Sequence, residues 1–254
     1  MFFLSTVGAE AHPANTKAVQ MIKARAPACW VCAVNIDFMR PVVVRRRVLL
    51  IAGLSAGLFA AGCRKATKLS AIKAGQTVLA FGDSVTYGTG AARGEDWPSL
   101  LAQKTGWKVV NAGIPGDSAA NGKGRIQALL DEHRPALVIL EIGGNDFLRR
   151  AAPAAVKEDL RQLIKTSLQA GAQVALVAIP ELSLMGMVAG KPSDSPMYAE
   201  LADEEKVSLV PHVFSDTLSR PELCADRIHP NALGYQHMAI GIHKRLQELG
   251  WAIL

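Results

Sequence analysis

The chain is organised around the stretch Thr77-Val-Leu-Ala-Phe-Gly-Asp-Ser84. A short and largely apolar run of this kind is typical of a buried strand, so we predict a strand over Thr77–Phe81 and a loop over Val85–Gly88. A serine at the carboxyl end of a strand can present its hydroxyl at the rim of a sheet. Gly, Asp and Ser are also common turn residues, and the partners of Ser84 must decide between these two interpretations.

The rest of the chain alternates apolar runs with helical patterns. Further strands are predicted at 107–111, 136–142, 173–179 and 207–210, and helices at 96–104, 118–133, 154–170 and from 231 onward. Within 154–170, the apolar face is predicted to hold Val156, Leu160, Leu163, Ile164 and Leu168. Because most of the strands are unbroken apolar runs, helices should cover both faces of the sheet. The sequence therefore predicts an α/β fold, a three-layer α/β/α sandwich with a mainly parallel five-stranded sheet.

The charge of the chain is concentrated near its N-terminus. The 254 residues are 50% hydrophobic and 20% charged, a composition that readily forms a globular core. The formal net charge is +6, and residues 1–63 alone hold seven Lys or Arg against two Asp or Glu. The remainder is close to neutral, so the composition does not indicate a nucleic-acid partner.

An export signal is predicted ahead of the folded part. Three arginines at 45–47 precede fifteen apolar or small residues at 48–62, which are followed by Cys63. This pattern describes a secretory signal, and the apolar run is shorter than the roughly 20 residues that a spanning helix needs. Its end, Leu58-Phe-Ala-Ala-Gly-Cys63, resembles a bacterial lipobox, which implies a lipid anchor on Cys63. A plain signal peptide and a retained membrane anchor are the alternatives.

These features suggest a division of the chain into four parts. Met39 begins a natural basic segment, so we interpret residues 39–63 as the signal peptide and 1–38 as an upstream extension that is not native. Residues 64–75 are interpreted as a linker and 76–254 as the folded domain. We expect a monomer that is exported and is either periplasmic or attached to the outer membrane of a bacterium.

Three further polar blocks follow predicted strands. They are Asn111-Ala-Gly-Ile-Pro-Gly-Asp-Ser118, Gly143-Gly-Asn-Asp146 and Asp226-Arg-Ile-His-Pro230. The carboxyl ends of parallel strands meet at one edge of a sheet, so these blocks should meet Ser84 there. Alone, Gly116 suits a tight turn, Asn145 a turn or helix cap, and His229 a structural position. Together the blocks supply a nucleophile, a base, an orienting carboxylate and oxyanion donors, which are the parts that acyl transfer requires.

The four blocks resemble those of the GDSL or SGNH hydrolase family, and most of all its thioesterase I and lysophospholipase L1-like (arylesterase) branch. The resemblance spans about residues 76–246 and implies a flavodoxin-like fold, no cofactor and no metal. It implies that Ser84 is the nucleophile, His229 the base and Asp226 its partner, with Ser84, Gly116 and Asn145 forming the oxyanion hole. Pro115 replaces a small polar residue common in this branch, but proline removes only its own N–H.

The resemblance further implies hydrolysis of acyl esters or thioesters through an acyl-enzyme. The same residues would serve a carbohydrate or peptidoglycan O-acetylesterase, although aromatic residues, which stack on sugars, are only 6% of the chain. A non-catalytic surface lipoprotein with this fold is disfavoured because the set of site residues is intact. Residues 182–190 carry no charge. We interpret Leu184, Met185 and Met187 either as the lining of a groove for short- to medium-chain acyl groups or as core residues under a loop.

Overall fold

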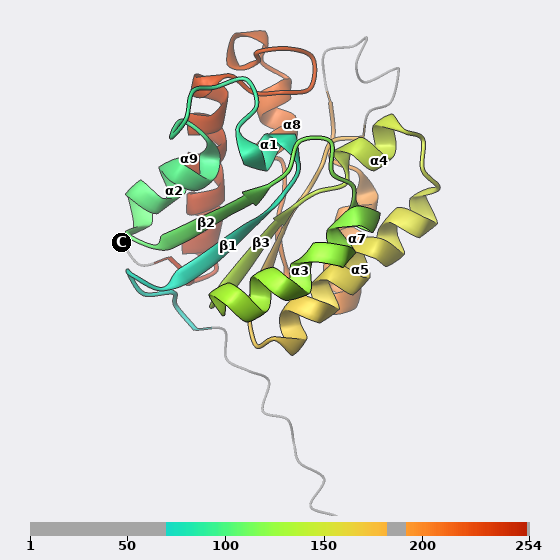
Figure 1. Cartoon of the computed structure of the whole chain (residues 1–254). Helices are drawn as coiled ribbons and strands as arrows, with labels where there is room; N and C mark the ends of the chain where they lie inside the picture. The colour runs from blue at the N-terminus through green and yellow to red at the C-terminus, as the bar shows by residue number, and fades with distance from the viewer. Residues whose placement is uncertain (1–69, 182–191, 253–254) are drawn as a thin grey trace, which may run out of the picture. The chain divides into compact units, whose positions relative to one another are not determined.

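Five strands form one parallel sheet in the order β2-β1-β3-β4-β5 (Figure 1). The strands are β1 (Thr77–Gly82), β2 (Lys108–Gly113), β3 (Leu137–Glu141), β4 (Gln173–Val177) and β5 (Ser208–Val210). The computed structural model describes residues 70–181 and 192–252. Every neighbouring pair of strands is parallel, which confirms the predicted fold class and the five predicted strands.

Helices cover both faces of the sheet (Figure 1). One layer holds α2 (Trp97–Thr105), α8 (Val213–Leu218) and α9 (Ala232–Glu248), and the other holds α3 (Ala119–His133), α5 (Pro153–Gln169) and α7 (Pro196–Glu205). Three shorter elements complete the described chain: α1 (Ser84–Tyr87), α4 (Gly144–Leu148) and the 3-10 helix η1 (Pro221–Leu223). The three-layer sandwich expected from the apolar strands is therefore present.

The core lies on both sides of a sheet whose central strands are buried. All five residues of β3 are buried, as expected for a strand covered on both faces. Along α5, four of the five residues predicted for the apolar face are buried, but Leu168 is 40% exposed. Ser167 takes the inward position instead, where its hydroxyl donates to the Leu163 carbonyl at 2.8 Å. The helical turn then carries Leu168 about 100° away from the core.

A short helix lies where the sequence predicted a loop, and one residue of the predicted linker is buried. The prediction of a loop over Val85–Gly88 is wrong, because Ser84–Tyr87 forms the short helix α1. Asp83 caps its first turn by accepting the Val85 N–H, and Gly88 ends it with φ +101°. Ile72 lies within the predicted linker, yet it is buried and forms a parallel bridge with Ala252.

The register of the sheet brings the ends of three strands to one level. Gly82 at the end of β1 pairs with Gly113 of β2 on one side and with Glu141 of β3 on the other. The loops that follow these three strands must therefore start side by side. This edge of the sheet is where the polar blocks of the sequence meet.

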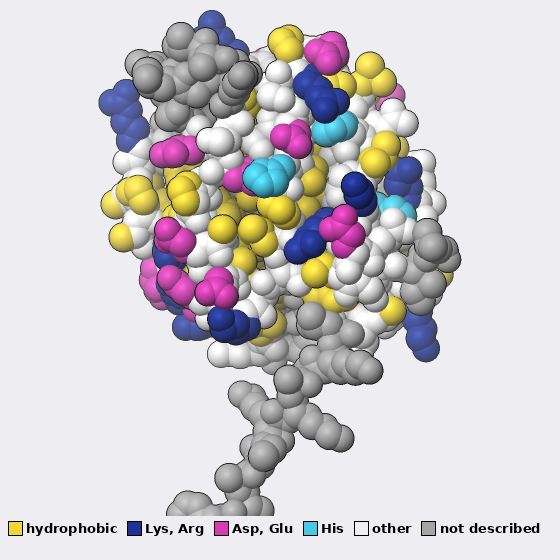
Figure 2. All heavy atoms as spheres, turned by 180° about the vertical axis from the view of Figure 1, so that it is seen from behind, with side chains coloured by type: hydrophobic (Ala, Val, Ile, Leu, Met, Phe, Trp, Pro, Cys, Tyr) yellow, Lys and Arg dark blue, Asp and Glu magenta, His cyan; other side chains and the backbone are white. Residues whose placement is uncertain are grey.

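The face of the molecule in Figure 2 shows no strong separation of charge among the described residues. On the face in Figure 2, basic and acidic side chains of the described residues are interspersed and no extended basic patch is seen. Within 70–181 and 192–252, no helix combines the length and the apolar character that crossing a membrane requires.

Candidate active site

Ser84 occupies the tight turn between β1 and α1. A side chain at Gly82 would place its Cβ about 2.2 Å from the Glu141 carbonyl oxygen, so only glycine allows this close approach of β1 to β3. The chain then turns sharply, and Ser84 becomes the first residue of α1. Its N–H donates to no other group in the described part of the chain, as expected at a helix N-terminus.

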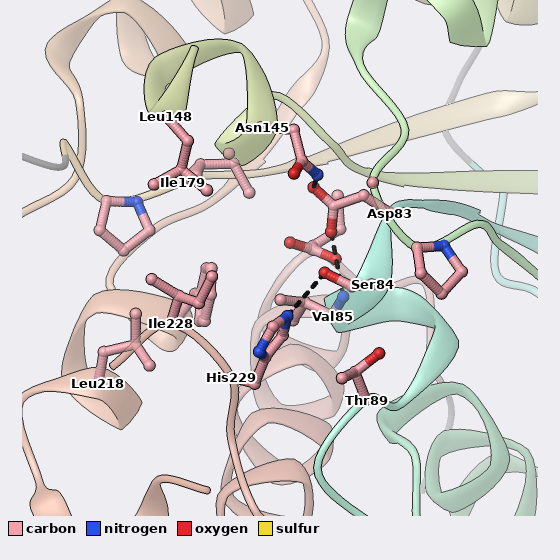
Figure 3. A pocket seen from close by; sticks show the side chains of 16 residues that line it. Asp83, Ser84, Val85, Thr89, Asn145, Leu148, Ile179, Leu218, Ile228 and His229 are labelled. Carbon is pink, nitrogen blue, oxygen red and sulfur yellow. Dashed lines mark hydrogen bonds between the residues drawn. The ribbon is translucent and has the colours of Figure 1, made fainter. Parts of the chain in front are cut away.

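Ser84, His229 and Asp226 form a continuous chain of hydrogen bonds. The distance from Ser84 Oγ to His229 Nε2 is 2.9 Å (Figure 3). The distance from His229 Nδ1 to Asp226 Oδ2 is 2.7 Å. The other oxygen of Asp226 accepts the N–H groups of Ile228 and His229, both at 2.8 Å. A short loop thus holds the carboxylate and the imidazole in one fixed arrangement.

The charge state of Asp226 follows from these contacts. Burial by itself would raise its pKa, but hydrogen bonds from the His229 ring and from the two backbone N–H groups outweigh it. The pKa of Asp226 is therefore held below its ordinary value. An ionised carboxylate at Nδ1 directs the other nitrogen, Nε2, toward Ser84 as the proton acceptor.

Two further hydrogen-bond donors lie beside Ser84. Gly116 adopts φ +80°, a conformation suited to glycine, and its carbonyl accepts a hydrogen bond from Arg149 at 2.8 Å. Its own N–H has no partner within the described ranges. Asn145, the second residue of α4, donates one amide N–H to Asp83 Oδ2 at 3.1 Å. Within the described residues, the second amide N–H of Asn145 has no partner.

Arg125 of α3 holds the ends of β1 and β2 together below these groups. It donates to the Gly82 carbonyl at 2.9 Å and to the Ala112 carbonyl at 2.8 Å. It also forms a salt bridge of 2.7 Å with Asp117, which follows Gly116, and it stacks over the Phe81 ring. The strand that leads to Ser84 and the loop that carries Gly116 are therefore tied to the same side chain.

A cavity of about 220 Å³ opens beside the Ser84 hydroxyl. Ser84, Gly116, Asn145 and His229 all line it, and so do Asp83 and Glu141. Much of the remaining wall is apolar and comes from Leu148, Ile179, Pro180, Phe214, Leu218 and Ile228. Figure 3 shows Leu148, Ile179, Leu218 and Ile228 together on one side of the Ser84–His229 pair. The site thus combines a polar end with an apolar pocket.

The structure brings together the five residues that the four sequence blocks supplied. Cys63, Leu184, Met185 and Met187 lie outside the described residues. Sequence reasoning missed the apolar side chains of the cavity, which come from α4, the segment after β4, α8 and the segment before His229. One signal was available, since Ile179 ends a predicted strand at the edge where the site was expected.

Comparisons with known proteins agree with this geometry. Residues 80–237 match the model of the GDSL-like lipase/acylhydrolase family. The chain belongs to this family. It is 34% identical to esterase TesA of Pseudomonas aeruginosa, over 78% of this chain and 96% of that protein. It is 35% identical to the thioesterase 1/protease 1/lysophospholipase L1 of Escherichia coli K12, over 69% and 86%.

A solved structure supports the same conclusion. The crystal structure of TesA superposes with a TM-score of 0.61 at 32% identity, covering 68% of this chain and 99% of the TesA chain. Family membership and these relatives show that the protein is an SGNH-type hydrolase of ester bonds.

Proposed function

We propose that the protein hydrolyses short- to medium-chain acyl esters or thioesters through an acyl-enzyme on Ser84. The observation that carries the proposal is the unbroken series of hydrogen bonds from Ser84 through His229 to Asp226, which ends at an apolar cavity. A serine hydroxyl becomes a useful nucleophile only when a base within hydrogen-bond distance removes its proton. His229 Nε2, at 2.9 Å, is placed to do so.

The chemistry then follows in two halves. Ser84 Oγ bonds to the carbonyl carbon while its proton moves to His229 Nε2, and the carbonyl oxygen becomes an oxyanion. The free N–H groups of Ser84, Gly116 and Asn145 receive that charge. His229 gives its proton to the leaving alcohol or thiol as the carbon–oxygen or carbon–sulfur bond breaks. Water then gives a proton to His229 and attacks the acyl-enzyme, and His229 returns that proton to Ser84 Oγ as the bond to the acyl carbon breaks and the acid leaves.

The apolar wall of the cavity favours substrates with a longer acyl chain over acetyl esters. Leu148, Ile179, Leu218 and Ile228 present a surface that a single methyl group would leave mostly in contact with water. Covering it with methylene groups contributes roughly 0.8 kcal/mol for each group that becomes buried. Binding should therefore strengthen as the chain grows, until the cavity is filled.

A substrate panel tests this function. The wild type and the Ser84→Ala variant are assayed with p-nitrophenyl acetate, butyrate, octanoate and palmitate, with acyl-coenzyme A thioesters, and with acetylated sugars. We expect kcat/KM to peak between butyrate and octanoate and the Ser84→Ala variant to lose activity on every substrate. Highest activity on acetylated sugars would instead support the O-acetylesterase. Equal activity of the two proteins would overturn the catalytic assignment.

The proposal includes export and a lipid anchor on Cys63. It is supported by the sequence ahead of the folded part, where a basic segment and an apolar run precede this cysteine. Expression of the wild type and the Cys63→Ser variant in a bacterial host, followed by fractionation, tests it. Movement of the variant from the membranes to the soluble fraction is expected. An unchanged distribution would favour a retained membrane anchor.

A further inference from the structure

Asp83 is a buried carboxylate beside the nucleophile to which the mechanism above gives no part. It is only 3% exposed, although it lines the cavity. Each of its oxygens accepts one hydrogen bond: Oδ1 from the Val85 N–H at 3.0 Å, and Oδ2 from the Asn145 amide at 3.1 Å. The first contact caps α1. The second joins Asp83 to a residue that is 62 positions away in the sequence.

The contact with Asn145 determines which way its amide faces. A primary amide can turn over by 180°, which exchanges its oxygen and nitrogen without changing its shape. An ionised carboxylate has no proton to donate, so Asp83 favours the orientation in which the nitrogen faces it. One N–H of Asn145 then points to Asp83, and the other has no partner among the described residues and remains for a ligand. The opposite orientation would direct the amide oxygen toward a developing oxyanion.

A second buried carboxyl group, Glu141, lies near Asp83, and the surroundings of the two groups decide which of them is ionised. Glu141 is fully buried, and its Oε2 lies 2.6 Å from the Thr86 hydroxyl. Burial raises the pKa of Glu141 well above its ordinary value, and the nearby charge of Asp83 raises it further. Two neighbouring carboxyl groups in one apolar site do not both ionise readily. The member of this pair that accepts N–H donors, Asp83, is therefore the one that carries the charge.

We propose that Asp83 is a positioning residue of the oxyanion hole, which orients the Asn145 amide so that its second N–H faces the reacting carbonyl oxygen. The proposal rests on the proposed function, because it requires Asn145 to be an oxyanion donor. Asp83 touches neither the substrate nor the reacting atoms in this scheme, and it acts entirely through Asn145.

A double-mutant cycle tests the coupling. Asp83→Asn, Asn145→Ala and the double variant are compared with the wild type for kcat and KM on p-nitrophenyl butyrate. Asn at position 83 can still cap α1 through its oxygen, but its NH2 group favours the turned-over amide of Asn145. We expect Asp83→Asn to lower kcat about 10²-fold with little change in KM, as loss of one oxyanion donor does. In the Asn145→Ala background the same change should have little further effect.

Asp96 provides a matched control. It is also buried and caps a helix, α2, accepting the Ser99 N–H at 2.9 Å, and it accepts an amide N–H from Asn111 at 3.1 Å. Asp96→Asn thus removes the same charge from an equivalent cap whose asparagine partner does not line the cavity. It should leave kcat within about threefold of the wild type and combine additively with Asn145→Ala.

The possible results are distinguishable. If the losses from Asp83→Asn and Asn145→Ala multiply in the double variant, Asp83 does not act through Asn145 and the proposal is overturned. If Asn145→Ala alone retains wild-type kcat, the oxyanion role in the proposed function fails first. If Asp83→Asn does not fold, Asp83→Ser replaces it, because serine keeps a capping oxygen but is too short to hold the Asn145 amide. The same coupling is then expected.

Discussion

Replacing Asp83 with asparagine should make the protein more stable at neutral pH while it makes the enzyme slower. Burial raises the pKa of Asp83 from the ordinary value of 3.8 to about 6, although hydrogen bonds from Val85 and Asn145 and the charge of His229 act in the opposite direction. The folded protein therefore holds a proton at this position more tightly than the unfolded chain does. Asparagine has nearly the same shape and never ionises, so it removes this difference.

The sign and size of the effect follow from the two pKa values. A group whose pKa is raised on folding contributes its full stability below the unfolded pKa, and that contribution is lost as the pH rises through the folded pKa. For a rise from 3.8 to about 6, the total is about 3 kcal/mol. The free energy of unfolding of Asp83→Asn, relative to the wild type, should thus increase by about 2 to 3 kcal/mol between pH 4 and pH 8.

Urea unfolding of both proteins at pH 4, 5, 6, 7 and 8 measures this difference. The titratable groups that act on Asp83 are Glu141, His229 and Asp117, and all three remain in the variant. Removing the charge of Asp83 also lowers the pKa of Glu141, and this change adds to the difference between the two curves in the same direction. A difference that stays constant within about 0.5 kcal/mol across this range would refute the reasoning, because it would mean that Asp83 titrates normally in the folded protein.

Three other predictions concern the remaining parts of the site. His229→Ala and Ser84→Ala should each lower kcat by roughly 10³-fold or more, and the double variant should be hardly worse than either, since the residues act as a unit; multiplying losses would contradict this. Arg125→Met should lower the free energy of unfolding by about 3 kcal/mol in urea titrations, because it leaves the buried carboxylate of Asp117 unpaired; a loss below about 1 kcal/mol would show that the contacts of Arg125 with Asp117, Gly82 and Ala112 contribute little. Leu218→Trp should reduce kcat/KM for the octanoate ester relative to the acetate ester by about tenfold or more, whereas Trp at the exposed position of Leu168 on α5 should not change that ratio; equal ratios in both variants would remove α8 from the acyl pocket.

The layers of the fold were predictable because burial leaves a direct mark on the sequence. A strand covered on both faces is expected to be largely apolar, and the first four residues of β3 are apolar in the sequence and buried in the structure. The short helices left no comparable mark. Helix α1 has four residues and α4 has five, which is too few for a helical period to show. The Asp83 cap supports α1, and tertiary contacts such as the hydrogen bond from Asn145 to Asp83 hold α4 in place.

The polar end of the site could be predicted and its apolar wall could not. Ser84, Gly116, Asn145 and His229 stand in blocks of turn-forming and polar residues, which are conspicuous after apolar strands. Leu218 and Ile228 look like any other apolar residues in their segments. Only the tertiary fold, in which α8 packs against α9, makes them walls of one cavity. A pocket of this kind is a property of the topology rather than of any local pattern.

The role of Asp83 could not be predicted from the sequence either, because it depends on the tertiary structure. In the sequence it precedes the nucleophile and has an ordinary explanation as a turn residue or helix cap. The register between β1 and β3, which pairs Gly82 with Glu141, brings the residue after Gly82 close to the start of α4, the helix that carries Asn145. A cap for one helix thereby becomes the acceptor for a side chain on another, at the cost of burying a charge. Stability alone would favour asparagine here at neutral pH, so the retained carboxylate is best explained by what it does to the Asn145 amide.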